Sequence, residues 1–189
     1  LHFSVNTNGK APLPNPYNYN YNGGKKAKDY EQTINETVYS TYANEQISIS
    51  RTKFHDLQMF HNIDSLWKGL EEKVNYRARY YKAEKAFHIA NRKSSKTDDD
   101  IYTNSFSYTD SASAKQVLVK NILKEGVLFE LKTLVDSISG PSKFVTEFYE
   151  SFTPKDTLLG KNVLTDKTKH FFEALRAKDS IVLESYGLI

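Results

Sequence analysis

The chain has 189 residues, of which 26 are Lys or Arg and 23 are Asp or Glu, so its net charge at pH 7 is +3. This length fits one compact domain with extensions, or two small domains. The chain contains no cysteine, which excludes disulfides, thiolate metal sites and cysteine nucleophiles. The small net charge does not by itself indicate a nucleic-acid partner. No apolar run approaches the ~18 residues of a membrane-spanning helix.

Residues 1–28 have the composition of an extended tail. Three prolines come first, asparagine and tyrosine then alternate, and two glycines and three lysines follow. Such a segment cannot bury enough apolar surface to fold alone, so we expect it to become ordered against a partner. Tyrosine combines an apolar ring with a polar tip, which suits interfaces. The expected partner-binding residues of the tail are Tyr17, Tyr19, Tyr21, Lys25 and Lys26.

The segment from Asp29 to Arg51 is ambiguous. Ile34, Val38 and Tyr42 are spaced four residues apart, as on one face of a helix. Ile47 and Ile49 instead alternate with polar residues, which predicts a short half-buried strand.

The segment from Asp64 to Lys93 predicts a long helix. An apolar stripe at helical spacing runs along it, and a second, aromatic-rich stripe lies roughly 100° around the helix. The first stripe consists of Leu66, Trp67, Leu70, Val74, Ala78 and Tyr81. The second stripe consists of Tyr76, Tyr80, Ala83, Phe87 and Ala90. We expect a helix with two apolar faces to contact two neighbours; the alternative is a central helix that is buried on most sides.

A strand or loop and a second long helix are expected next. Aromatic residues alternate from Tyr102 to Tyr108, as in an exposed strand. Apolar residues then recur at helical spacing from about residue 110 to residue 139. These residues are Val119, Leu123, Val127, Leu131, Leu134 and Ile138. Gly126 within this helix would cost ~1 kcal/mol relative to alanine, so a close packing contact or a kink is expected there.

Two shorter helices are expected in the last third of the chain. The Gly140-Pro141 pair ends one helix and starts the next. The apolar face of that helix consists of Phe144, Val145, Phe148 and Phe152. The last helix would carry Phe171, Phe172 and Leu175. The predicted fold is therefore mainly α, with about four helices, room for a minor β-strand pair, and a single helical domain over residues 29–189.

No motif in the sequence predicts catalysis, a metal or a cofactor. The chain has no Gly-x-Ser-x-Gly nucleophile motif. His55 and His61 are six residues apart, whereas paired zinc ligands on a helix need a spacing of four. The acidic run at residues 98–100 lacks the alternation of a calcium-binding loop and is typical of a solvated linker. We therefore expect a protein that is not an enzyme, with no catalytic residue, metal site or cofactor.

The strongest chemical feature is a basic segment from Lys73 to Lys96. It contains eight Lys or Arg and one Glu, which gives a charge of +7, and aromatic residues lie between the basic ones. Basic residues contact phosphates and aromatic rings stack on bases, so the segment is a candidate nucleic-acid interface; the alternative partner is an acidic protein surface. The candidate contact residues are Arg77, Arg79, Tyr80, Lys82, Lys85, Arg92 and Lys93.

The function expected from these features is that of a structural or interaction subunit in a large multi-protein assembly. The expected partners are other protein subunits and, in the second reading, nucleic acid. A virion component is favoured; a start at Leu1 rather than Met would fit a processed virion protein or an imported one. The alternatives are a nucleic-acid-binding module that uses residues 73–96 and an accessory subunit of an organelle complex. No membrane span is expected, and the lack of cysteine argues against a secreted disulfide-rich protein.

Overall fold

The computed structural model describes residues 32–40, 45–80, 87–110, 113–154 and 159–179. Six strands and three helices lie in these ranges. In chain order they are β1 (Gln32–Tyr39), β2 (Gln46–Lys53), α1 (Ile63–Tyr80), β3 (His88–Lys96), β4 (Tyr102–Thr109), β5 (Lys115–Lys124), β6 (Val127–Asp136), α2 (Lys143–Ser151) and α3 (Thr168–Arg176).

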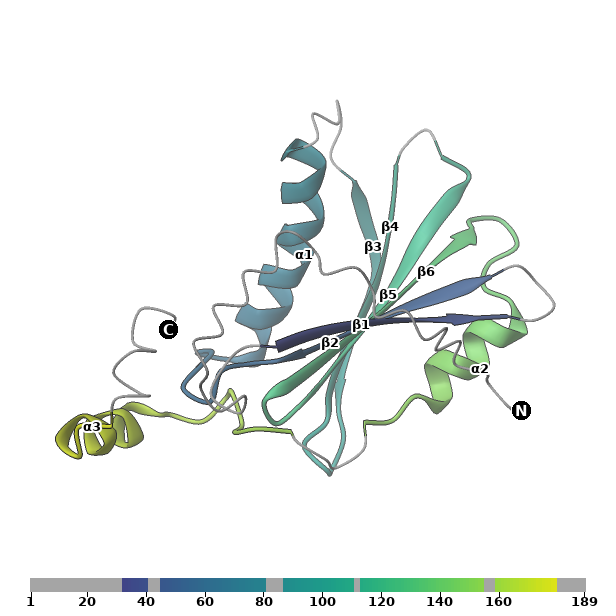
Figure 1. Cartoon of the computed structure of the whole chain (residues 1–189). Coiled ribbons are helices and arrows are strands. Elements are labelled where there is room, and N and C mark those ends of the chain that lie inside the picture. Colours follow the sequence, from purple (N-terminus) through teal and green to yellow (C-terminus); the bar gives the residue numbers. More distant parts are fainter. Residues whose placement is uncertain (1–31, 41–44, 81–86, 111–112, 155–158, 180–189) are drawn as a thin grey trace, which may run out of the picture.

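The strands form one antiparallel sheet in the order β1-β2-β6-β5-β4-β3. The sheet is strongly twisted (Figure 1). Strands β3 to β6 follow one another as neighbours, whereas α1 carries the chain from β2 to the far edge of the sheet. β6 then returns to pair with β2, so that Ile49 lies opposite Leu131.

The prediction of a mainly α fold is wrong. The expected helix over residues 110–139 is the β5–β6 hairpin, in which Lys124 pairs with Val127 around a two-residue turn. A spacing of four is an even number, so residues four apart lie on one face of a strand as well as on one face of a helix. The turn contains Glu125 at φ 53° and Gly126, and it divides what had been interpreted as one continuous stripe.

The expected helix from Asp64 to Lys93 is also wrong in its second half. α1 has 18 residues and ends at Tyr80, and the chain forms the edge strand β3 from His88 onward. The second apolar stripe is therefore not a helix face. Phe87 lies beyond α1, where its ring packs against Tyr108 with the centroids 5.2 Å apart.

Several local predictions are confirmed. The alternation at Ile47 and Ile49 belongs to β2, and the alternating aromatics from Tyr102 to Tyr108 belong to β4. β4 is not the exposed strand that was predicted, because Phe106 is buried. The two short C-terminal helices are α2 and α3. The helical interpretation of Ile34 and Val38 is wrong, because both residues lie in β1; Tyr42 lies outside the described residues.

The two faces of the sheet carry separate hydrophobic cores. α1 covers the face that we call the α1 face, and α2 covers the opposite α2 face; Figure 1 shows the two helices on opposite sides of the strands. The α1-face core contains Phe54, Leu66, Trp67, Leu70, Leu123, Leu128 and Val163. The α2-face core contains Val38, Ile47, Ile49, Ile122, Leu131, Val145 and Phe148.

The expected tail, with Tyr17, Tyr19, Tyr21, Lys25 and Lys26, lies outside the residues that the structure describes. α1 is the longest of the described helices. None of them combines the length and the apolar character that crossing a membrane requires.

Candidate functional site

A groove of about 620 Å³ lies between α1 and the α1 face of the sheet. Its apolar part includes Phe54, Phe60, Leu66, Leu70 and Leu128. Most of these residues also belong to the α1-face core, so the groove opens directly onto packed apolar side chains. Its volume lies in the range of small-molecule sites, which are lined mainly by apolar groups with a few polar ones.

The polar part of the groove comes from two sides. β2 contributes the hydroxyls of Ser50 and Thr52, and β6 contributes Glu130 and Lys132. The Lys132 ammonium lies 2.6 Å from a Glu130 carboxylate oxygen. Their side chains are 29% and 24% exposed, so this ion pair lies at the groove and not in bulk solvent.

The helix side of the groove carries Ser65, Gly69 and Lys73. These residues are four apart, so they lie on one stripe of α1. A Cβ atom placed on Gly69 would meet no atom within 4 Å. No neighbouring backbone therefore requires a glycine there, and the missing side chain leaves space in the groove.

A row of polar side chains crosses the α1 face beside the groove. Asn121 is fully buried and pairs across the strands with Glu130. Its side-chain amide donates to the Asn104 Oδ1 at 3.3 Å, and the Asn104 amide donates to the Ser94 Oγ at 3.2 Å. Within the described part of the chain, the Asn121 Oδ1 has no hydrogen-bond partner, which is costly for a buried oxygen.

The outer edge of β1 has no pairing strand among the described residues. The Ser40 N–H donates to the Glu45 carbonyl at 2.9 Å, and hydrogen-bonded positions alternate along an antiparallel pair. The even-numbered residues of β1 therefore direct their backbone groups toward β2. The odd-numbered ones direct theirs outward. Ile34 and Tyr39 on this strand are 48% and 52% exposed.

The opposite edge of the sheet, β3, differs from β1 in ways that discourage pairing. β3 contains a bulge between Ala90 and Lys93, where Asn91 has φ 56°. It also carries three basic residues, whereas β1 has eight residues without a Lys, Arg or Pro. Bulges and edge lysines are the usual means by which proteins prevent a sheet edge from pairing.

The basic segment does not form the single basic helix that the sequence predicts. Arg77, Arg79 and Tyr80 belong to the last turns of α1, whereas Arg92 and Lys93 lie on β3. Lys82 and Lys85 lie outside the described residues.

Two of the basic side chains on β3 are paired with acids. Arg92 Nε lies 2.8 Å from Glu71 on α1, and Lys96 Nζ lies 2.7 Å from Asp100. The hydrogen bond to Asp100 also raises the pKa of Lys96. These pairs reduce the net positive charge that β3 presents to a phosphate backbone.

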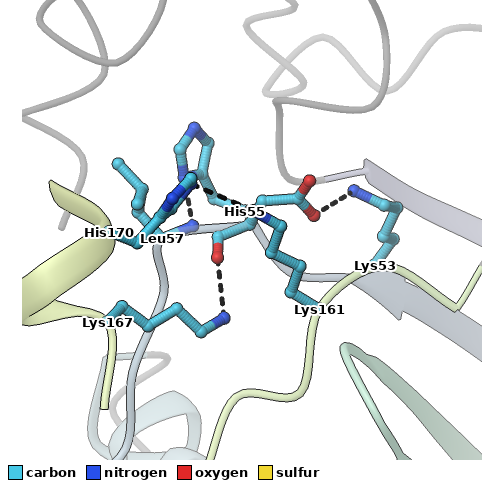
Figure 2. A network of polar contacts seen from close by, with 7 residues as sticks. Lys53, His55, Leu57, Lys161, Lys167 and His170 are labelled. Atoms are coloured by element: carbon cyan, nitrogen blue, oxygen red, sulfur yellow. Dashed lines mark hydrogen bonds and ion pairs between the residues drawn. The ribbon is translucent and has the colours of Figure 1, made fainter. Parts of the chain in front are cut away.

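A lysine-rich network fixes the loop after β2 (Figure 2). Lys53 Nζ contacts the Asp56 carboxylate at 3.2 Å, and Lys167 Nζ donates to the Asp56 carbonyl at 2.6 Å. The Leu57 N–H donates to His55 Nδ1 at 3.0 Å. Burial lowers the pKa of Lys167. Because both lysines bind this loop, we interpret the network as structural.

No group of three or more metal-ligating side chains lies together in the described ranges. The chain matches no protein-family model, and comparisons with curated proteins and with solved structures likewise found no match. The sequence did not reveal the groove, whose residues come from β2, α1, β4 and β6 and from the segments beside them. The one available signal was the spacing of Ser65, Gly69 and Lys73.

Proposed function

We propose that this chain is a non-enzymatic interaction subunit that assembles through the outer edge of β1. The observation that carries the proposal is the contrast between the two sheet edges. β3 has a bulge and basic side chains, whereas β1 directs the N–H and C=O groups of Asn35 and Thr37 outward without either protection. An unprotected edge strand is a ready template for a further strand.

A second copy of the chain is the partner that the β1 sequence fits best. A two-fold antiparallel pair centred on Asn35 places Ile34 of each copy opposite Glu36 of the other. The only charged residue of β1, Glu36, then faces no like charge, and the exposed Ile34 gains a cross-strand neighbour. The self-complementary surface is the kind that a two-fold dimer requires.

The experiment is sedimentation velocity over roughly 1 to 200 µM, a range that covers small and weak interfaces. We expect a monomer–dimer equilibrium in the wild type. Asn35→Pro removes an N–H that points away from β2, so it should abolish the dimer and leave the fold intact. Asn35→Lys should have the same effect through charge. Asn35→Ala keeps the N–H and is the matched control, which should still form the dimer.

The contrary results are equally specific. A wild-type chain that stays monomeric across this range would overturn the proposal. So would Asn35→Pro and Asn35→Lys variants that form dimers as strongly as Asn35→Ala while their circular dichroism spectra match the wild type.

A further inference from the structure

The groove between α1 and the sheet has the chemistry of a site for an amphipathic anion. One part is apolar, with Phe54, Phe60 and Leu128 among its lining residues. Phe54 and Phe60 pack edge to face with their centroids 5.3 Å apart, so this part of the groove is preformed. An apolar chain in contact with these rings would remove its own surface from water.

The charged part of the groove carries an excess of one positive charge. Its charged lining residues are Lys73, Lys132 and Glu130, which is two positive charges against one negative. Glu130 is already engaged by Lys132 at 2.6 Å. Within the described ranges Lys73 has no acidic partner within ion-pair distance, so its ammonium is the group available for a ligand anion.

The space between these two parts is maintained by Gly69. A glycine inside a helix costs about 1 kcal/mol relative to alanine, and no neighbouring atom prevents a side chain at this position. Gly69 lies one turn before Lys73 on the same stripe of α1. A side chain at position 69 would therefore occupy the volume that leads from the apolar part to the ammonium.

We propose that this groove binds a ligand with an apolar chain and a terminal carboxylate. The chain lies against Phe54, Phe60 and Leu128, and the carboxylate accepts hydrogen bonds from the Lys73 ammonium. Ser50 and Thr52 on β2 line the polar side of the groove. This site is separate from the β1 edge, so the ligand inference and the proposed assembly can fail independently.

The test uses dodecanoate and dodecanol below their aggregation limits, measured by isothermal titration calorimetry with the full-length chain. Dodecanoate should bind about tenfold more tightly than dodecanol, because only the carboxylate meets Lys73. Lys73→Gln should reduce dodecanoate binding to the level of dodecanol. Gly69→Leu should abolish binding of both. Lys68→Leu adds the same side chain at an exposed neighbouring position of α1 outside the groove and is the matched control, which should bind both ligands as the wild type does.

Three results would overturn the inference. They are the absence of dodecanoate binding to the wild type, equal affinity for the acid and the alcohol, and wild-type affinity in a folded Gly69→Leu variant. Thermal unfolding of each variant, followed by circular dichroism, separates lost binding from lost structure. Because Gly69 faces open space, the leucine variant is expected to stay folded.

Discussion

Gly126 and Leu159 are joined by a backbone hydrogen bond, in which the Gly126 N–H donates to the Leu159 carbonyl at 3.0 Å. The Gly126 carbonyl in turn accepts from the Phe54 N–H at 2.8 Å. The turn of the β5–β6 hairpin is therefore fixed between the chain that follows β2 and the segment that leads from α2 toward α3. The sequence predicted a close packing contact or a kink at Gly126 inside a long helix; the helix is wrong, but the close contact is present.

This contact makes Gly126→Ala the most disruptive small substitution in the turn. A Cβ atom there would lie 2.6 Å from the Lys161 carbonyl oxygen and 2.8 Å from the Leu159 carbonyl oxygen. Because both obstacles are backbone atoms, relief requires a shift of the chain. We expect the free energy of unfolding to fall by about 2–3 kcal/mol, measured by urea denaturation. A change below about 0.5 kcal/mol would show that the contact is looser than described.

Gly69→Ala should have the opposite effect. The new methyl group meets no atom within 4 Å, and alanine is favoured over glycine inside a helix. We expect the free energy of unfolding to rise by about 0.5–1 kcal/mol in the same urea titration. The two alanine variants together test whether the surroundings of each glycine, rather than the residue type, decide the sign of the change in the free energy of unfolding.

The N-terminus of α2 depends on Ser142. Its Oγ accepts a hydrogen bond from the Val145 N–H at 3.3 Å and donates one to the Glu45 carboxylate. Ser142→Ala should lower the free energy of unfolding by about 1 kcal/mol, as for other lost helix caps. Ser142→Thr keeps the hydroxyl and is the control. Equal losses in both variants would indicate that the side-chain volume matters and the cap does not.

Lys167 should make stability depend on pH in the alkaline range. Burial, with smaller effects from Lys161 and Lys53, lowers the pKa of Lys167, while Asp56 and Glu125 act in the opposite direction. The unfolded chain then holds more protons than the folded chain between the lowered pKa and about 10.5. The contribution of Lys167 to stability therefore rises as pH increases through that window.

Lys167→Met removes this titration. We expect the wild type to gain stability relative to the variant as the pH rises toward about 10.5, measured by urea unfolding at each pH. A difference between the two proteins that stays constant over this range would contradict the lowered pKa. Lys169→Met, at an exposed position of α3, is the matched control for the loss of a lysine side chain.

Local patterns in the sequence showed where several secondary-structure elements lie, but they did not decide whether each element is a helix or a strand. The Gly140-Pro141 pair and the phenylalanines after it predicted α2, and the structure shows that the helix is capped by Ser142. Val119 and Leu123 fit a strand and a helix equally, since four residues span two strand repeats and about one helical turn. The information that decided between them lay in Glu125 and Gly126, which allow a tight turn, and in the β-branched residues that favour strands.

The candidate sites could not be predicted from the sequence, for a different reason. Lys73 and Glu130 line one groove although 57 positions separate them in the numbering. The two residues lie close together because β6 is an inner strand of the sheet. The local spacing of apolar residues does not predict that position. The unprotected character of β1 likewise becomes apparent only when the strand is known to lie at an edge.

The placement of β6 between β2 and β5 also bears on how the chain is made. Ser48 lies opposite Lys132, so the N-terminal hairpin has no permanent neighbour until the ribosome has delivered a strand some eighty residues later. Closing so long a loop costs entropy before any pairing offsets it. The β1–β2 hairpin therefore cannot pair with β6 until most of the chain has been synthesised. We expect the completion of the sheet to be a late and slow step in folding.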